Sequence, residues 1–299
     1  MHQDCINVHI PSRRFLSRCA RKGLIIICII LSYINAAGQN ENSTDSLKRG
    51  FSIFNPVPKA LMREDMETDR PDITESPITV DAGHFQIEGD LLRFKKHSEE
   101  GNSNRQLLLT PVTIKAGLTN DIDFQIVFET VRFESHATEQ STKERYSSYG
   151  SLAFRLKKNI IGNDGDKFAI AALPYIKLPS NKHFEHHLIE GGVIVPMVWK
   201  LSEKWSVGFQ EEVDYLAEEE AYDWQLLQSL AADYEINDRL KGILETYMTY
   251  EIKQHHLENY VNLAIQLSLL KNVAFDVGTI QGFQPGSEHH YYAGFAVRL

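Results

Sequence analysis

Apolar and polar residues alternate with a period of two in segment after segment between residues 83 and 299. The clearest run covers residues 122–128, where Ile and Phe side chains alternate with mostly polar ones, and another run places Leu108 and Ile114 on one apolar face. Such alternation is typical of β-strands that bury one face only. It predicts about twelve strands of roughly 9–12 residues, the length that a tilted membrane strand requires. No sustained helical period competes with it.

The predicted connections between these strands alternate in length. Short turns are predicted at 119–121, 201–204, 237–239 and 270–272, and longer polar links at 96–104, 135–147, 179–187, 218–221, 251–256 and 282–290. Short turns on one side and longer loops on the other are typical of an up-and-down antiparallel barrel. The sequence therefore predicts an all-β transmembrane β-barrel over residues 83–299, with short periplasmic turns and longer external loops.

Alternation alone does not say which face of the predicted barrel meets lipid, because a soluble barrel with an apolar interior gives the same pattern. Trp199 and Trp205 flank the predicted turn at 201–204, and tryptophan prefers the membrane interface. The polar face is rich in carboxylates, as expected for a wet or ion-paired lumen. Glu211 is an exception, since it falls on the predicted lipid side, where a charge is costly unless a bulge or a rim position removes the conflict.

The first 37 residues have the order of features of an export signal. Basic residues precede an apolar stretch at 23–34, and small residues follow around Ala37 and Gly38. This order predicts a signal peptide at residues 1–37, because the apolar stretch is too short to span a membrane as a helix. Residues 38–82 are polar and contain several prolines. They are predicted to form a periplasmic leader or plug segment without regular structure.

The charge balance narrows the class of partner. The chain has 31 Lys and Arg residues against 40 Asp and Glu residues, a net charge of −9. The predicted signal peptide holds five basic residues and one acidic residue, so its removal changes −9 to −13. A binder of nucleic acid needs a basic footprint, and no nucleic-acid partner is predicted. All three cysteines, Cys5, Cys19 and Cys28, lie in the signal peptide, so the mature chain would offer no thiol chemistry.

A motif before the first predicted strand resembles a known family. It reads Glu-Thr-Asp-Arg-Pro-Asp-Ile-Thr-Glu-Ser-Pro at residues 67–77 and continues at 82–88. Shorter matches follow at 173–179, at 190–192 leading to Pro196, at Glu245, at Asp276 and at 294–299. The chain from residue 67 to residue 299 thereby resembles the bacterial outer-membrane family labelled "putative meta-pathway of phenol degradation", or simply "transporter". The resemblance implies an outer-membrane barrel that passes small, often aromatic, molecules.

If the apolar face meets lipid, the opposite face lines a lumen. We predict that ionisable residues line this lumen and the path of a solute: Arg70, Glu88, Asp90, Lys115, Lys177, Glu190, Glu212, Asp233, Glu245, Asp276 and Arg298. Arg70 would meet carboxylates such as Glu88, Glu245 or Asp276 if residues 38–82 fold into the lumen as a plug. The alternative for the Arg70 segment is a solvated periplasmic turn.

Histidines cluster in three of the predicted long links. The weak metal-ligand candidates are His183, His186, His187, His255, His256, His289 and His290. Imidazoles that converge with carboxylates bind Zn²⁺, Cu²⁺ or Ni²⁺, but solvated loop histidines are commoner, so neither a firm metal site nor a cofactor is predicted. The sequence contains no Gly-x-Ser-x-Gly or His-Glu-x-x-His motif, and no enzymatic activity is predicted.

Together these patterns predict a barrel in the cell outer membrane of a Gram-negative bacterium. Its predicted function is the passive passage of small solutes, with aromatic or hydrophobic molecules as candidates. The predicted partners are outer-membrane lipid, a small-molecule solute and the barrel-assembly machinery. Two alternatives stay open at this point: a non-conducting structural or surface barrel, and a soluble exported β-protein that binds an apolar ligand.

Overall fold

The computed structural model of this protein describes residues 47–99, 102–109, 111–128, 130–137, 144–148, 150–179, 188–218 and 221–299. The chain divides into a unit of residues 1–41, which lies outside the described residues, and a unit of residues 42–299. The signal peptide therefore stays a prediction. Within the described part of the chain, no helix combines the length and the apolar character needed to cross a membrane.

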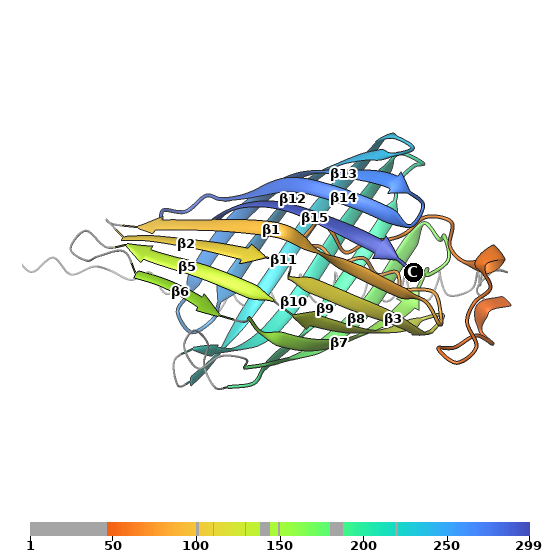
Figure 1. The fold of residues 1–299 in the computed structure, drawn as a ribbon, viewed down its shortest axis with the longest axis horizontal. Coiled ribbons are helices and arrows are strands. Elements are labelled where there is room, and N and C mark those ends of the chain that lie inside the picture. Colours follow the sequence, from red (N-terminus) through yellow and green to blue (C-terminus); the bar gives the residue numbers. More distant parts are fainter. Residues whose placement is uncertain are drawn as a thin grey trace, which may run out of the picture. The chain divides into compact units, whose positions relative to one another are not determined.

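The described part of the second unit consists mainly of β-strands; a short 3₁₀ helix, η1, covers Lys59–Leu61, and residues 47–48 are helical. The strands of the first half are β1 (Phe85–Glu99), β2 (Asn102–Leu109), β3 (Val112–Thr119), β4 (Ile122–Phe128), β5 (Val131–Ala137), β6 (Glu144–Ser148), β7 (Leu152–Ile161) and β8 (Phe168–Leu178). The strands of the second half are β9 (Glu190–Lys200), β10 (Trp205–Glu218), β11 (Ala221–Asn237), β12 (Leu240–Glu251), β13 (His256–Leu270), β14 (Val273–Gly282) and β15 (His289–Arg298). Paired strands are antiparallel, and the pairing of β15 with β1 closes the sheet into a barrel (Figure 1).

Three pairs of strands lie end to end and act as single spans: β2 with β3, β4 with β5, and β6 with β7. Strand β1 shows this directly, because its first residues pair with β3 and its later residues pair with β2. Counting each pair once, the described strands make a barrel of twelve spans. The prediction of an up-and-down antiparallel barrel of about twelve strands is confirmed.

The interruption between β2 and β3 changes which residues face inwards. Leu108 and Lys115 are both buried, at 3% and 2% exposed, although seven positions separate them and a continuous strand would point them to opposite faces. Pro111 lies between the two strands, and their register with β1 is the same on both sides of it. The change of phase coincides with a bulge in β1 between Asp90 and Leu92, which shifts the pairing of β1 with β15 by one residue. The prediction that placed Leu108 on the same face as Ile114 was therefore wrong.

Two of the predicted long links are largely strand. Strand β1 continues to Glu99 and β2 begins at Asn102, while β5 continues to Ala137 and β6 begins at Glu144. The links predicted at 96–104 and 135–147 were wrong because these strand ends carry many polar residues on both faces. Without alternation, the sequence has no local indication of a strand. We call this end of the barrel the external end, and the end that holds Phe85, Leu299 and the short turns the periplasmic end.

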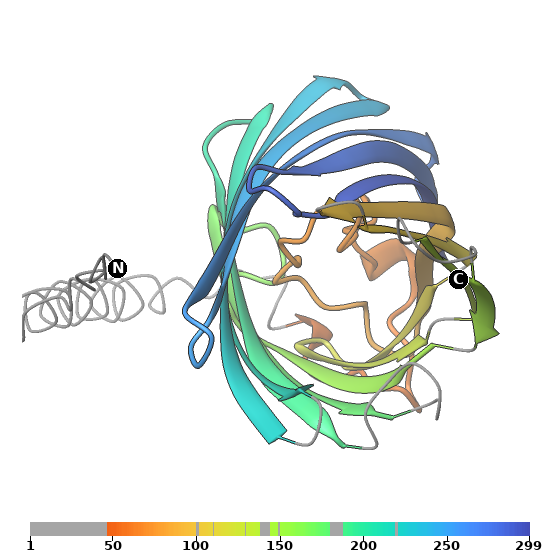
Figure 2. The same cartoon turned by 90° about the vertical axis from the view of Figure 1, so that its left-hand side faces the viewer.

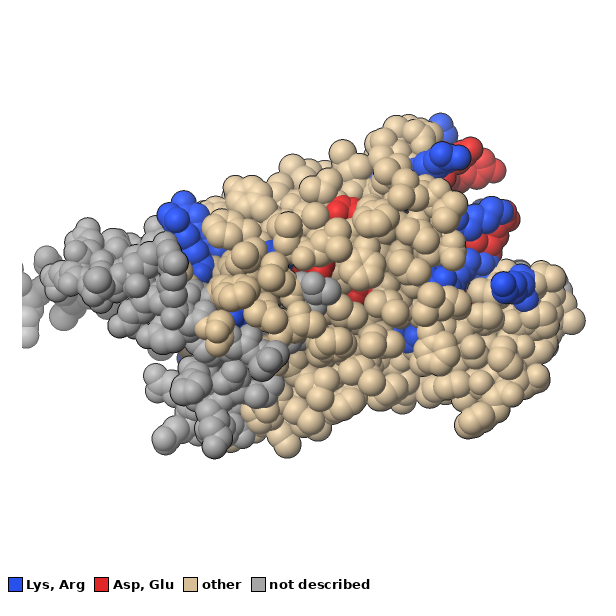
Figure 3. Space-filling view, in the orientation of Figure 1, with Lys and Arg blue, Asp and Glu red and all other residues tan. Residues whose placement is uncertain are grey.

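The outside of the barrel is apolar and the inside is polar. Leu230, Leu244 and Leu263 are about half exposed on the outer wall, whereas Gln125 and Asn262 face inwards and are fully buried. Figure 3 shows one side of this wall as largely uncharged between charged groups at its two ends. This confirms the predicted transmembrane arrangement and is the opposite of a soluble barrel with an apolar interior.

Glu211 keeps its place on the outer face. Its register partner is Gln228, and the pairing of β10 with β11 contains no bulge there. The Gln228 side-chain amide donates a hydrogen bond of 2.5 Å to Glu211 Oε1. Glu211 therefore stays on the lipid-facing side, where Gln228 is its hydrogen-bond partner, and no bulge turns it away from lipid.

Residues 67–82, the later part of the segment before β1, lie inside the ring of strands, while the first described residues lie beyond one end of the barrel (Figure 1). Figure 2, which looks into the barrel, shows residues 67–82 as an irregular chain within the ring. Because this segment makes no regular hydrogen-bonded structure of its own, its backbone groups need partners from the barrel wall. Those partners define the candidate functional site.

Candidate functional site: a plug across the lumen

The plug segment, which we define as residues 67–82, corresponds to the motif before the first strand. Pro71 and Pro77 prevent regular structure in it, because proline donates no backbone hydrogen bond and restricts the preceding residue. The segment contacts inward-facing side chains from opposite parts of the barrel wall. The contacts fall into four groups, described here in chain order.

The first group surrounds Asp69. Its Oδ1 accepts a hydrogen bond of 2.8 Å from Lys157 Nζ on β7, and its Oδ2 forms an ion pair with Lys115 on β3. Lys115 also bonds to Glu88 on β1, which accepts the Asp69 backbone N–H at 3.0 Å. Three strands are thus tied to one plug residue by alternating positive and negative groups, which is the condition for burying charge at acceptable cost.

The second group is a clamp on Arg70. Its guanidinium donates to both oxygens of Asp276 on β14, at 3.1 and 2.7 Å, and lies 2.6 Å from Asp90 on β1. Bidentate pairing of this kind is the strongest geometry available to arginine. The guanidinium also lies against Gly294 on β15, where a Cβ atom would overlap it. The clamp therefore requires a residue without a side chain at position 294.

The third group is an anchor built on Glu245 of β12. Its carboxylate accepts hydrogen bonds from the backbone N–H groups of Ile73 and Thr74, at 2.9 and 2.7 Å, and from the Thr74 hydroxyl at 2.6 Å. Ser229 on β11 and Asn262 on β13 complete the network. Glu245 is fully buried, so it satisfies two plug N–H groups that would otherwise be unpaired in the lumen.

The fourth group holds the end of the plug segment. Glu75 forms an ion pair with Arg155 on β7, and its backbone N–H donates 2.7 Å to Gln210 on β10. Further on, the Val80 N–H donates 3.1 Å to Asp123 on β4. The plug is therefore fixed to the wall along its whole length, from Asp69 to residue 80.

One plug carboxyl is buried without a hydrogen-bond partner. Asp72 Oδ1 has no partner among the described residues. Burial raises the pKa of Asp72 well above its usual value, and the nearby carboxylates of Asp233 and Glu245 add to the rise. Burial and the Asp69 carboxylate likewise raise the pKa of Glu75 to about 7. Two plug carboxyls thus resist ionisation while the plug is docked.

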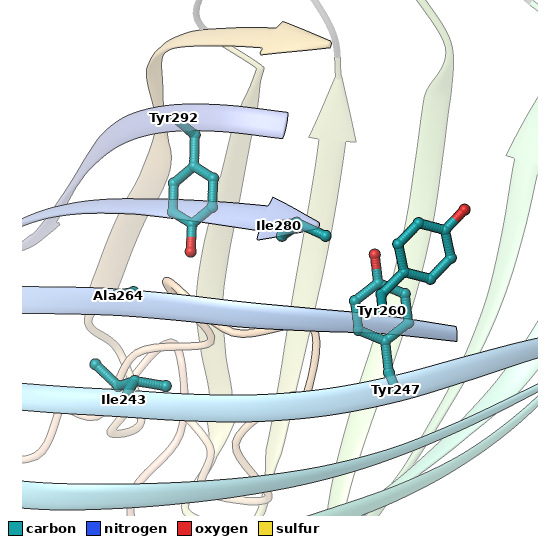
Figure 4. Close-up of a cluster of buried hydrophobic side chains, with 6 residues drawn as sticks. All are labelled: Ile243, Tyr247, Tyr260, Ala264, Ile280 and Tyr292. Carbon is teal, nitrogen blue, oxygen red and sulfur yellow. The ribbon is translucent and has the colours of Figure 1, made fainter. Parts of the chain in front are cut away.

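An aromatic cluster lines the lumen beside the plug. Figure 4 shows its six residues on β12 to β15: Ile243, Tyr247, Tyr260, Ala264, Ile280 and Tyr292. The rings of Tyr247 and Tyr260 are stacked, with centroids 4.7 Å apart and planes 12° apart. Ile73 of the plug packs against the cluster, and the Tyr292 hydroxyl donates to the Pro71 carbonyl at 3.2 Å. The largely polar lumen therefore has an aromatic sector here, and a smaller apolar cluster of Ala171, Leu173 and Ile194 lies on β8 and β9.

Among the described residues, no hydrogen bond or ion pair joins the remaining predicted lumen residues to the plug segment. Lys177 on β8 and Glu190 on β9 form an ion pair at 2.8 Å, and Asp233 is 3.4 Å from Lys241. Glu212 accepts a hydrogen bond from Gln210. Arg298 lies at the periplasmic rim, where it donates to the backbone carbonyls of residues 64 and 65. Whether any of these residues lies on the path of a solute stays a prediction.

The candidate metal-ligand histidines do not converge among the described residues. His255 and His256 lie at the turn between β12 and β13, while His289 and His290 begin β15. His183, His186 and His187 lie outside the described residues. Within the part of the chain that the structure describes, no three His, Cys, Asp or Glu side chains are placed to share a metal ion.

Several plug contacts involve residues that the sequence analysis did not single out. Arg155, Lys157, Gln266 and Tyr292 all contact the plug segment. Each occupies an inward position on its own strand, so the alternation placed them on the lumen side. What the sequence lacked was any indication of which lumen residues meet the plug.

A closed barrel with an apolar outer wall, a polar lumen and a segment held across that lumen defines a β-barrel of the outer-membrane type. More particularly, this chain belongs to the family described as "Putative MetA-pathway of phenol degradation", whose model matches residues 68–297. This match confirms the resemblance inferred from the plug motif. No curated protein sequence matches the chain.

The chain is also similar to solved structures. The COG4313 outer membrane channel from Pseudomonas putida F1 has a TM-score of 0.59 and 11% identity, over 78% of this chain and 100% of that chain. The NanC porin has a TM-score of 0.48 and 12% identity, over 72% of this chain and 100% of that chain. At such low identity the first likeness concerns the fold alone.

Proposed function

We propose that this protein resides in the outer membrane and lets small solutes pass passively across it, with aromatic or hydrophobic molecules as candidates. The observation that carries this proposal is the way the lumen is closed. Hydrogen bonds and ion pairs, such as those of Arg70 and Glu245, hold the plug segment to the barrel wall, together with the packing of Ile73 against the aromatic cluster. Such contacts can exchange for water or solute, so the plug can open a path without unfolding the barrel.

The aromatic cluster supports the solute class. Tyr247, Tyr260 and Tyr292 bring three aromatic rings together on one side of a largely polar lumen. Aromatic rings favour stacked or edge-on contact with other rings, and a wet lumen lets a solute reach them without crossing lipid. The three tyrosines are 8%, 6% and 2% exposed, so a small aromatic solute would contact them once the plug segment has moved.

A second candidate function is a barrel that conducts nothing. The observation that favours it is the number of separate anchors: the plug segment is tied to β1, β3, β7, β12 and β14 by buried charged groups. Breaking buried pairs costs several kcal/mol each when one partner is left alone, about 3–5 in typical cases. If all anchors hold together, the plug never leaves the lumen.

Planar-bilayer conductance tests the two functions. We would compare the native protein with a plug-release variant, Arg70→Ala with Glu245→Gln, and with the control Lys158→Gln, which removes only an exposed ion pair to Asp121. A gated channel should show rare openings that become frequent in the plug-release variant and stay rare in the control. If the plug-release variant is folded but shows no conductance, the proposed passage of solutes is wrong.

Solute uptake addresses the substrate class separately. Vesicles containing the plug-release variant should admit a neutral phenol-sized aromatic faster than a sugar of similar size. Equal rates would contradict an aromatic preference but leave passage intact. Recovery in the outer-membrane fraction and heat-modifiable migration in gels would test the location and the assembly of the barrel.

A further inference from the structure

Three basic residues stand side by side on the outer wall at the external end. In the strand register, Lys96 on β1 lies opposite His289 on β15 on one side and opposite Arg105 on β2 on the other. Lys96 and Arg105 are exposed. Partners directly opposite in an antiparallel pair are about 5 Å apart, and like charges in such positions repel. We call this arrangement the basic row, and an anion bound beside it would offset the repulsion.

The inward-facing neighbours of the basic row show what neutralisation by the protein looks like. Lys95 and His290, which are also register partners, lie 3.7 and 2.7 Å from the carboxylate of Glu288. The basic row has no such group, since no acidic side chain among the described residues forms an ion pair with Lys96 or Arg105. In addition, His289 Nδ1 is buried without a hydrogen-bond partner. Figure 3 shows blue side chains gathered at this end of β1 and β2.

The position of the basic row relative to the apolar wall indicates where the anion comes from. The outward row directly beneath it contains Tyr291, Phe94, Leu107 and Phe133, again in register. Tyr291 and Phe133 are about half exposed. An aromatic row followed by a basic row is the order expected where acyl chains end and lipid headgroups begin.

The height of the basic row along the barrel axis also agrees with the level of the lipid headgroups. Eleven positions separate Phe85, at the periplasmic end of β1, from Lys96. At about 3.3 Å per residue and a strand tilt of about 40°, they span about 25–28 Å along the barrel axis. The apolar band of outer-membrane barrels is about 25 Å tall. The basic row therefore lies at the external headgroup level.

We propose that Lys96, Arg105 and His289 form a binding site for the phosphate of a phosphorylated lipid in the external leaflet, such as lipopolysaccharide. Arginine matches phosphate with its planar fork, and lysine adds a point charge next to it. The aromatic row beneath would pack against the upper part of the same lipid's acyl chains. The site depends on the barrel standing in the outer membrane but not on any solute passing through it.

Lipid binding to the purified full chain in detergent tests the site. The probes are a lipopolysaccharide that keeps its lipid phosphates and the same molecule after their removal. Native protein should bind the phosphorylated form at least tenfold more tightly. The variant Lys96→Gln with Arg105→Gln should lose that preference, whereas Lys96→Arg with Arg105→Lys should keep it.

A matched control and a competitor make the outcome decisive. Lys204→Gln with Arg239→Gln removes the same charge from exposed turns at the periplasmic end and should change binding less than twofold. Equal losses in both Gln variants, or no loss in the first, would overturn the site. If millimolar inorganic phosphate displaces the lipid, the basic row is a site for free anions, and the proposal of a lipid ligand is wrong. Heat-modifiable migration shows that each variant is folded, and conductance plays no part, so failure here leaves the proposed passage untouched.

Discussion

The two faces of a single strand follow opposite rules in this protein. On β12, Leu244 points outwards and is 54% exposed, while its neighbour Glu245 points inwards and is fully buried. Leu244 needs only apolar surroundings, whereas Glu245 holds Ile73 and Thr74 through hydrogen bonds of defined geometry. The comparison teaches that the outer face tolerates exchange among apolar residues. The inner face does not, because each loss there leaves a buried polar group unpaired.

The largest effect is expected at the inner anchor. Glu245→Leu leaves the plug N–H groups of residues 73 and 74 without acceptors, so plug docking should weaken by about 3 kcal/mol or more. The plug segment should then be cut by added protease while the barrel stays intact. The matched outer change, Leu244→Ala, should cost only about 1 kcal/mol of barrel stability and leave the plug protected. Equal protease sensitivity of the two variants would contradict the comparison.

A smaller effect is expected where the wall and the plug touch without a hydrogen bond. Gly294→Ala places a methyl group where the Arg70 guanidinium lies. Arg70 should leave its clamp on Asp276 and Asp90, weakening plug docking by about 2 kcal/mol. Protease sensitivity of the plug segment measures this change. Gly242→Ala on the same barrel, where a Cβ atom meets only the side chain of Ile236 at 3.6 Å, should have no such effect.

Docking of the plug segment should also depend on pH, because carboxyl groups of the plug are buried in the lumen. The pKa of Glu75 is raised to about 7 and that of Asp72 is raised as well, so the docked plug binds protons more tightly than the released plug. Docking is then strongest below the ordinary carboxyl pKa and weakens as the pH rises towards 7, by about 1 kcal/mol per pH unit. Channel openings should be more frequent at pH 7.5 than at pH 5.5. The variant Glu75→Gln should flatten this dependence; an unchanged slope would exclude Glu75 as its source.

The smallest effect, and one of opposite sign, is expected on the outer face. Replacing the Glu211–Gln228 pair by two leucines removes a polar pair from the lipid-facing wall and should stabilise the barrel by about 1 kcal/mol. Urea unfolding in lipid vesicles, followed by tryptophan fluorescence, measures this gain. A loss of stability in the double variant would contradict this expectation and show that the Glu211–Gln228 pair stabilises the barrel.

Much of the fold was accessible from the sequence because strand geometry is local. Ile126 and Gln125 point to opposite faces simply because they are neighbours in a strand, and no knowledge of the rest of the chain is needed. The prediction failed where local geometry is interrupted, as between Leu108 and Lys115 around Pro111. It also failed at strand ends such as Glu99, where polar residues on both faces hide the period.

The candidate site was only partly accessible. Arg70 and its possible acidic partners could be named from the sequence, but Asp90 was not among the partners considered for it, and Lys157 and Tyr292 were not singled out at all. Each of these contacts joins residues far apart along the chain; Arg70 and Asp276 are 206 positions apart. Which of many inward carboxylates receives the arginine depends on the path of the plug segment across the lumen, and no short-range pattern contains that path.

The sequence by itself determined that this chain forms about twelve amphipathic strands with one apolar and one polar side, because side-chain direction along a strand depends only on position. Only the tertiary structure decided which segment occupies the lumen and where along a strand the inward-facing positions shift by one residue. Closing the ring fixes which side chains face one another across the lumen. The plug then settles where most of its buried backbone N–H groups and charges find partners.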